Sequence, residues 1–174
     1  SKLSKRQGHV SVDDFLNEGY LSKALINFIA LLGWNPKNNN EIFSIEELIN
    51  EFNIDNVQKA GAVFDVDKLN WMNAQYLKKI DIDNLIPIAK NIFKENDCEI
   101  NDESDFREIL QFTKGRSNTI KDMASLAKPF FEEPLYNPDY LDLLNDAQSK
   151  EMYSILIKEI MNLDLTNELK IKQI

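Results

Sequence analysis

The chain is poor in the residues that build disulfides, metal sites and membrane spans. Its 174 residues include one cysteine, Cys98, and one histidine, His9. A single thiol excludes a disulfide within the chain, and one Cys with one His argues against a zinc site made by this chain alone, so we expect no metal site. No apolar run approaches the length that spans a bilayer, and no signal-peptide pattern is present. We therefore expect a cytoplasmic protein without a membrane partner.

The pattern of a β-strand is missing as well. No segment alternates apolar and polar residues for long enough to predict a strand, whereas apolar residues recur every three or four positions along most of the chain. We therefore predict an all-α fold made of helical bundles, in which 43% hydrophobic residues supply one sizeable core or two small ones. The clearest apolar stripes run from 21 to 32, 69 to 80, 85 to 93, 106 to 112, 120 to 127 and 152 to 163.

Local signals predict where several helices begin. Ser44 and Glu47 form a capping box, which predicts a helix from Ile45 to Phe52, and Asp65 is placed as the N-cap of the helix that follows. The helix over 21–32 carries so many apolar residues that we expect it to be buried nearly all round. For Trp71, which lies off the stripe of its helix, packing against that buried helix is favoured over direct contact with RNA.

Acidic residues exceed basic ones, and the net charge is −9. Such a surface repels a polyanion in general, so a nucleic acid can dock only where basic side chains gather locally. One such gathering lies between residues 113 and 128, where Lys114, Arg116, Lys121 and Lys128 face a single acid, Asp122.

The segment 114–119 is the sharpest local motif in this basic region. Gly115 frees the backbone, and Ser117 or Asn118 can cap the helix that follows, which would leave unpaired amides beside two cationic side chains. Elementary chemistry therefore predicts an anion site at this helix start. An ordinary capped helix with solvated charges is the alternative.

A second basic segment opens the chain. Lys2, Lys5 and Arg6 surround Ser4 in a stretch that is too short and too polar to pack. Three cations around a serine suit a mobile loop that neutralises phosphate oxygens, as in a loop that completes an ATP site. A solvated tail without a ligand is the alternative.

Residues 2–6, Lys-Leu-Ser-Lys-Arg, resemble the second signature of the class I aminoacyl-tRNA synthetases, in the form usual in glutamyl-tRNA synthetases. Further segments resemble that family in the right order: 14–15, 19–21, 24–27, 31–34, 41–44 and 62–73, of which the last looks like its Val-Phe-Asp-x-x-Lys-Leu-x-Trp-x-Asn stretch. The resemblance is looser from there to about Tyr136. The alternative is a helical protein-interaction module whose basic N-terminal residues are incidental.

The resemblance also implies a division of the chain. Residues 1–9 would end a catalytic domain, 10–80 would form a stem-contact helical domain, 81–132 a first anticodon-binding subdomain, and 133–174 an incomplete second one. The nucleotide-binding fold and its His-x-Gly-His signature would precede Ser1, so we expect an inactive fragment of the parent ligase. We further expect residues 1–9 to be mobile, and the segment after Pro138 to be less ordered than 10–128 or buried in an intermolecular contact.

In the parent reaction that the resemblance implies, glutamate attacks the α-phosphorus of ATP to give glutamyl adenylate and pyrophosphate. The glutamyl group then passes to the 3′ end of tRNA. Lys2 and Lys5 are the expected catalytic cations, and Lys2, Ser4, Lys5 and Arg6 the expected ATP contacts. ATP with Mg²⁺ would serve the parent enzyme, whose absent catalytic domain would also hold glutamate, and the fragment alone should hold no cofactor.

The expected macromolecular partner is a glutamate-accepting tRNA, and no DNA is expected. Arg116 lies where glutamyl-tRNA synthetases place an arginine that inspects the anticodon, and a guanidinium can hydrogen-bond a base edge bidentately. Lys114 and Lys121 are the expected further tRNA contacts.

Overall fold

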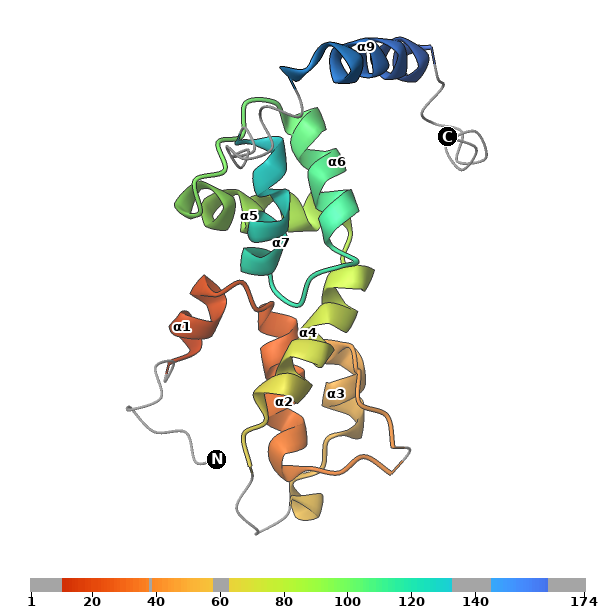
Figure 1. Ribbon diagram of the computed structural model, residues 1–174. Helices are drawn as coiled ribbons and strands as arrows, with labels where there is room; N and C mark the ends of the chain where they lie inside the picture. Colours follow the sequence, from red (N-terminus) through yellow and green to blue (C-terminus); the bar gives the residue numbers. More distant parts are fainter. Residues whose placement is uncertain (1–10, 38, 58–62, 133–144, 163–174) are drawn as a thin grey trace. The chain divides into compact units, whose positions relative to one another are not determined.

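A computed structural model describes residues 11–37, 39–57, 63–132 and 145–162. No strand occurs in these ranges, where the one β-type pairing is an isolated bridge between Trp34 and Val57. The predicted all-α fold is confirmed. The helices shown in Figure 1 are α1 (Val12–Asn17), α2 (Ser22–Gly33), α3 (Ile45–Glu51), η2 (Ile54–Asn56), α4 (Val66–Lys79), α5 (Ile82–Glu95), α6 (Glu103–Thr113), α7 (Ile120–Ala127), η3 (Lys128–Phe130) and α9 (Ala147–Met161).

Local side chains start several of these helices as the sequence predicts. The Ser44 hydroxyl accepts from the Glu47 amide at 3.1 Å, and the Glu47 carboxylate accepts from the Ser44 amide at 2.6 Å, which completes the predicted capping box of α3. Asp65 caps α4 by accepting from the Lys68 amide. These starts depend on residues three apart in sequence, so tertiary structure is not needed to find them.

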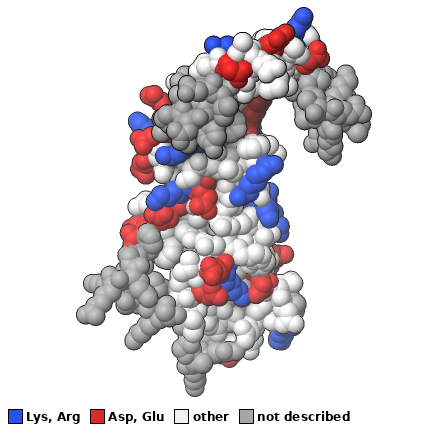
Figure 2. Space-filling view, viewed as in Figure 1, with Lys and Arg blue, Asp and Glu red and all other residues white. Residues whose placement is uncertain are grey.

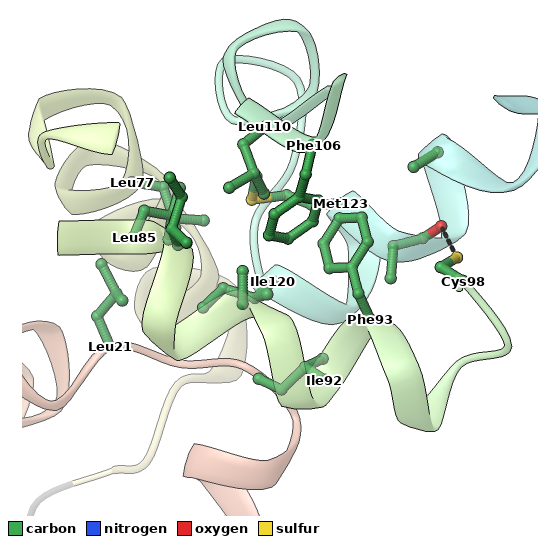
Figure 3. Close-up of a cluster of buried hydrophobic side chains, with 14 of the residues drawn as sticks. Leu21, Leu77, Leu85, Ile92, Phe93, Cys98, Phe106, Leu110, Ile120 and Met123 are labelled. Carbon is green, nitrogen blue, oxygen red and sulfur yellow. Dashed lines mark hydrogen bonds between the residues drawn. The ribbon is translucent and has the colours of Figure 1, made fainter. Parts of the chain in front are cut away.

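The chain divides into two compact units, residues 1–132 and 133–174. In the first unit α2 packs on α4 and α3, while α5, α6 and α7 pack on one another. The largest buried cluster lies among α5, α6 and α7, where the Phe93 and Phe106 rings meet edge to face with centroids 5.0 Å apart (Figure 3). Cys98 closes one end of it and donates to the Ala124 carbonyl at 3.6 Å; burial raises the pKa of this thiol.

This largest cluster also takes in residues from the N-terminal helices. Leu21, Ala24 and Leu77 belong to it together with Leu85 and Ala89. The buried contacts therefore continue across residue 80, where the sequence places a domain boundary. The division at residues 9 and 80 stays a prediction.

Two expectations about burial are wrong. Trp71 is 44% exposed and so lacks the buried position expected of it, whereas Trp34 at the end of α2 is 2% exposed. α2 is not buried all round either, because Ile26 and Ile29 are more than half exposed. In the part of the chain that the structure describes, α2 packs mainly on α3 and α4, and its Ala24 also reaches the largest cluster. The side chains of Ile26 and Ile29 remain largely in solvent.

In the second unit α9 stands without a buried side chain. Its apolar residues Met152, Ile155, Leu156 and Ile160 are all exposed. Leu163 and the apolar residues after it lie outside the described residues, so the expected order of the segment after Pro138 stays a prediction. None of the helices in the described ranges has the length and apolar character that a bilayer crossing requires.

Candidate nucleic-acid interface

Of the predicted tRNA contacts, Lys114 and Arg116 lie on the connection between α6 and α7, and Lys121 lies in the first turn of α7. Hydrogen bonds fix this connection to two distant parts of the first unit. The Asn73 side-chain amide of α4 donates to the Asn118 carbonyl at 2.5 Å. The Ile120 amide donates to the Gly19 carbonyl, between α1 and α2, at 3.1 Å. The connection is therefore held in place by α4 and by the turn before α2.

The helix cap at this connection differs from the expectation. Thr119, rather than Ser117 or Asn118, is the N-cap of α7 and forms a capping box with Asp122. The Asp122 carboxylate accepts from the Asn118 and Thr119 amides at 3.1 and 3.0 Å, and the Thr119 hydroxyl accepts from the Asp122 amide at 3.1 Å. These amides are occupied by the chain's own acceptors, so the helix start does not form the anion site that the sequence suggests.

Gly115 does not have the backbone role expected of it. Gly19 has a φ of +88°, but Gly115 does not adopt a positive φ. A Cβ atom added to Gly115 would meet nothing within 4 Å. Neither the conformation nor the packing of this chain therefore requires glycine at position 115.

Each of the three predicted basic residues has a partner within the chain. Lys114 donates to the Ile80 carbonyl at 3.1 Å, which satisfies the C-terminal end of α4. Lys121 pairs with both carboxylate oxygens of Glu18, at 2.9 and 3.0 Å, in an ion pair that is partly exposed on both sides. Glu18 thus partly neutralises Lys121, whereas the hydrogen bond to a neutral carbonyl restrains Lys114 and leaves its charge unpaired within the described residues.

Arg116 is held more firmly than an exposed arginine usually is. Its Nη1 donates to the Phe112 carbonyl at 2.7 Å, and its guanidinium carbon lies 4.4 Å from the centroid of the Phe112 ring. Arg116 itself is exposed. The guanidinium has five N–H groups, so the bond to Phe112 leaves donors for a ligand while the ring restrains the side chain.

The sequence did not reveal the partner of Arg116. Phe112 continues the apolar stripe of α6, which suggests a core position, yet it is 46% exposed and contacts the exposed Phe130 of η3. Gly19 also matters more than its sequence neighbourhood suggests, because its carbonyl positions α7. Gly19 and Ile120 are about one hundred positions apart, and the local sequence around either residue does not indicate such a contact.

Acidic and basic side chains are interspersed on the face shown in Figure 2. The basic residues near the α6–α7 connection are therefore not part of a broad basic surface. Because the net charge is −9, a polyanion could bind only at such a local group of basic side chains. Lys2, Ser4, Lys5 and Arg6 lie outside the described residues, and their roles in ATP binding and catalysis stay predictions. In the described ranges no group of His, Cys, Asp and Glu is placed to hold a metal ion.

Comparison with known proteins gives two family matches. Residues 1–71 match the catalytic domain of class I tRNA synthetases of the E and Q type, and residues 69–174 match an anticodon binding domain. The glutamate–tRNA ligase of Alkaliphilus metalliredigens is 35% identical over 166 residues, which are 91% of this chain and 34% of that protein. The ligase of Clostridium novyi is 48% identical over 103 residues, or 57% and 21% of the two lengths.

Solved structures agree with these matches. A crystal structure of a glutamate tRNA ligase from Elizabethkingia meningosepticum superposes with a TM-score of 0.74 and 31% identity, covering 94% of this chain and 36% of that one. The chain thus spans 34% and 36% of the two relatives that it matches along most of its own length. Because the anticodon-binding match takes in more than half of the chain, and the relatives agree over nearly all of it, the chain belongs to the glutamyl-tRNA synthetase family.

Proposed function

We propose that this chain is the tRNA-binding part of a glutamate–tRNA ligase. We propose the ligase reaction for a longer protein that includes this chain. In that reaction glutamate and ATP give glutamyl adenylate, and the glutamyl group then passes to the tRNA 3′ end. ATP with Mg²⁺ and glutamate would be held by the catalytic domain, to which Lys2, Ser4, Lys5 and Arg6 would contribute. The match of residues 69–174 to an anticodon binding domain carries this proposal.

The geometry of Arg116 supports a base-reading role for this residue. A guanidinium that is fixed in plane can present paired donors to a base edge, and the pairing is worth about 1–3 kcal/mol of discrimination. Lys114 and Lys121 are point charges near the same connection, which suits contacts with phosphate. The cytoplasm, where aminoacylation takes place, is the proposed location.

Binding of the chain to glutamate-accepting tRNA tests the proposal. Arg116→Ala should reduce discrimination between the cognate and an altered anticodon by about 1–3 kcal/mol. Lys114→Ala should weaken binding to both RNAs alike, because a phosphate contact carries no sequence information. Fluorescence anisotropy with labelled transcripts over a range of salt concentrations measures both effects.

Arg107→Ala is the matched control for Arg116, since Arg107 is an exposed arginine of α6 that pairs with Asp83. It should leave discrimination unchanged. Equal losses for both anticodons on changing Arg116 would remove the base-reading role. A wild-type chain that binds an unrelated tRNA as well as the cognate one would favour the protein-interaction module instead.

A further inference from the structure

Two exposed phenylalanines lie beside Arg116 without an evident task in the fold. Phe112, in the last turn of α6, is 46% exposed, and Phe130, in η3, is 57% exposed. Their rings meet edge to face, with centroids 5.8 Å apart and planes at 81°. Two large rings in contact at a surface expose apolar area that burial would otherwise remove from water.

Arg116 extends this pair into a layered arrangement. Its guanidinium carbon lies 4.4 Å from the Phe112 ring centroid and its Nη1 donates to the Phe112 carbonyl, so ring and backbone together restrain the guanidinium. A planar group with a ring on one side has a second face that another planar group can cover, and Arg116 is exposed. The order along the arrangement is therefore Phe130, Phe112, Arg116 and solvent.

The charges nearby decide what can occupy the open face. Glu108 lies one helical turn before Phe112, and Phe130 lines a small cavity of about 130 Å³ together with Asp102 and Asp105. These carboxylates disfavour phosphate in the vicinity of the two phenylalanines. A flat, neutral group can approach where phosphate cannot, and unpaired nucleic-acid bases stack on aromatic rings and on guanidinium planes.

We propose that one unpaired base of the tRNA stacks on the outer face of the Arg116 guanidinium, with Phe112 as the residue that positions the arginine and Phe130 as the support of Phe112. This proposal rests on the proposed function, because it needs tRNA as the ligand. It gives Phe112 and Phe130 a role in binding. The position of Phe112 on the apolar stripe of α6 does not suggest such a role, and neither does the position of Phe130 in the short helix η3.

Three variants of the full chain test this proposal against glutamate-accepting tRNA. Phe112→Leu keeps an apolar side chain but removes the plane, and should weaken binding about tenfold. The slope of log Kd against log salt should stay unchanged, because no phosphate contact is lost. Phe112→Tyr keeps the ring and should bind within about twofold of the wild type. Arg116→Lys keeps the charge without the plane and should weaken binding as Phe112→Leu does.

Phe52→Leu is the matched control, because Phe52 is 41% exposed and touches another ring, that of Trp34, away from the α6–α7 connection. It should bind tRNA as the wild type does. A tRNA with 2-aminopurine at single positions of the anticodon loop adds a direct readout. One position should be quenched on binding to the wild type and to Phe112→Tyr, and remain bright with Phe112→Leu.

Unchanged affinity of Phe112→Leu, a changed salt slope, or failure of Phe112→Tyr to restore binding overturns the stacking role. The proposed function survives these results if the wild type still prefers its cognate tRNA. Absence of that preference in the wild type overturns both. Circular dichroism checks the fold of each variant, and if Phe112→Leu is unfolded, Phe130→Leu decides the matter with an expected loss of about threefold at unchanged salt slope.

Discussion

Gly19 holds two helices together through a conformation that other residues avoid. Its φ is +88°, and a Cβ atom at this position would lie 2.6 Å from the Ile120 amide nitrogen and 2.8 Å from that of Lys121. Its carbonyl accepts from the Ile120 amide at the start of α7. The turn before α2 and the α6–α7 connection can approach this closely only because position 19 has no side chain.

Gly19→Ala should therefore lower the free energy of unfolding by about 2–4 kcal/mol, from backbone strain together with the clash at Ile120. Gly115→Ala is the control, because nothing lies within 4 Å of its added Cβ and its φ is not positive. It should leave stability unchanged or raise it by about 0.4–1 kcal/mol. Urea unfolding of both variants gives the comparison. Similar values for the two would show that the turn can shift without cost.

Tyr76 provides a pH-dependent contribution to stability. Its hydroxyl donates to the Phe43 carbonyl, and burial, with Glu47 nearby, raises the pKa of Tyr76 to about 12. The folded state thus holds this proton more tightly than the unfolded chain, where the pKa is near 10. The contribution is complete below pH 10 and is lost as the pH rises toward 12.

Unfolding of wild type and Tyr76→Phe between pH 8 and pH 11.5 measures this contribution. The stability difference between the two proteins should be constant up to about pH 10 and shrink above it. Comparing the two proteins cancels the titration of lysines that both share. Absorbance at 295 nm should also show one late-ionising tyrosine fewer in the variant. A difference that stays constant to pH 11.5 would contradict the raised pKa.

The sequence predicts where a helix begins better than it predicts which other elements pack against that helix. Ser44 and Asp65 were predictable caps because each bonds an amide three residues ahead. The α7 start offered three capable residues in a row, and the choice of Thr119 depends on the bonds from Asn73 and to Gly19, which are remote in sequence. A periodic stripe likewise places a side chain on a helix face without saying whether another element covers it. The expected burial of Trp71, which lies off the stripe, depended only on the general tendency of large aromatic side chains to be buried.

The candidate site shows the same limit. Composition and a resemblance to a family were enough to select Lys114, Arg116 and Lys121. The partners that now restrain two of these cations lie 34 and 103 residues away, at the Ile80 carbonyl and at Glu18. Only the fold brings such groups together, so their restraint could not be predicted.

The ion pair between α1 and α7 offers a test of how far a helix contact competes with the proposed ligand. Glu18→Gln removes the partner of Lys121 and should strengthen tRNA binding up to about fivefold at low salt, since a partly exposed pair is worth about 0.2–1 kcal/mol. Glu103→Gln is the control, because it removes the same charge from an exposed pair with Lys90. Equal gains in both variants would point to net charge alone, and no gain would argue against a tRNA contact at Lys121.

The two units of the chain should differ in how easily they open. Leu69, Met72 and Leu77 of α4 are completely buried, whereas α9 has no buried residue. Amides of α9 should therefore exchange with deuterium at much lower protection than those of α4. Exchange read by mass spectrometry, on a sample shown to be monomeric by sedimentation, measures this. Equal protection in both helices would mean that α9 gains cover that the described residues do not provide.

The buried cluster that crosses residue 80 has a practical consequence for anyone who divides this chain. A cut between Ile80 and Asp81 would divide the residues of this cluster between two pieces. The first piece would carry Leu21, Ala24 and Leu77, the second would carry Leu85 and Ala89, and each group would lose its buried contacts with the other. Neither piece would then be a self-sufficient module. When the two pieces are expressed together, they should associate and fold as a single unit, as the halves of a split reporter protein do. This position therefore suits fragment complementation better than the preparation of separate domains.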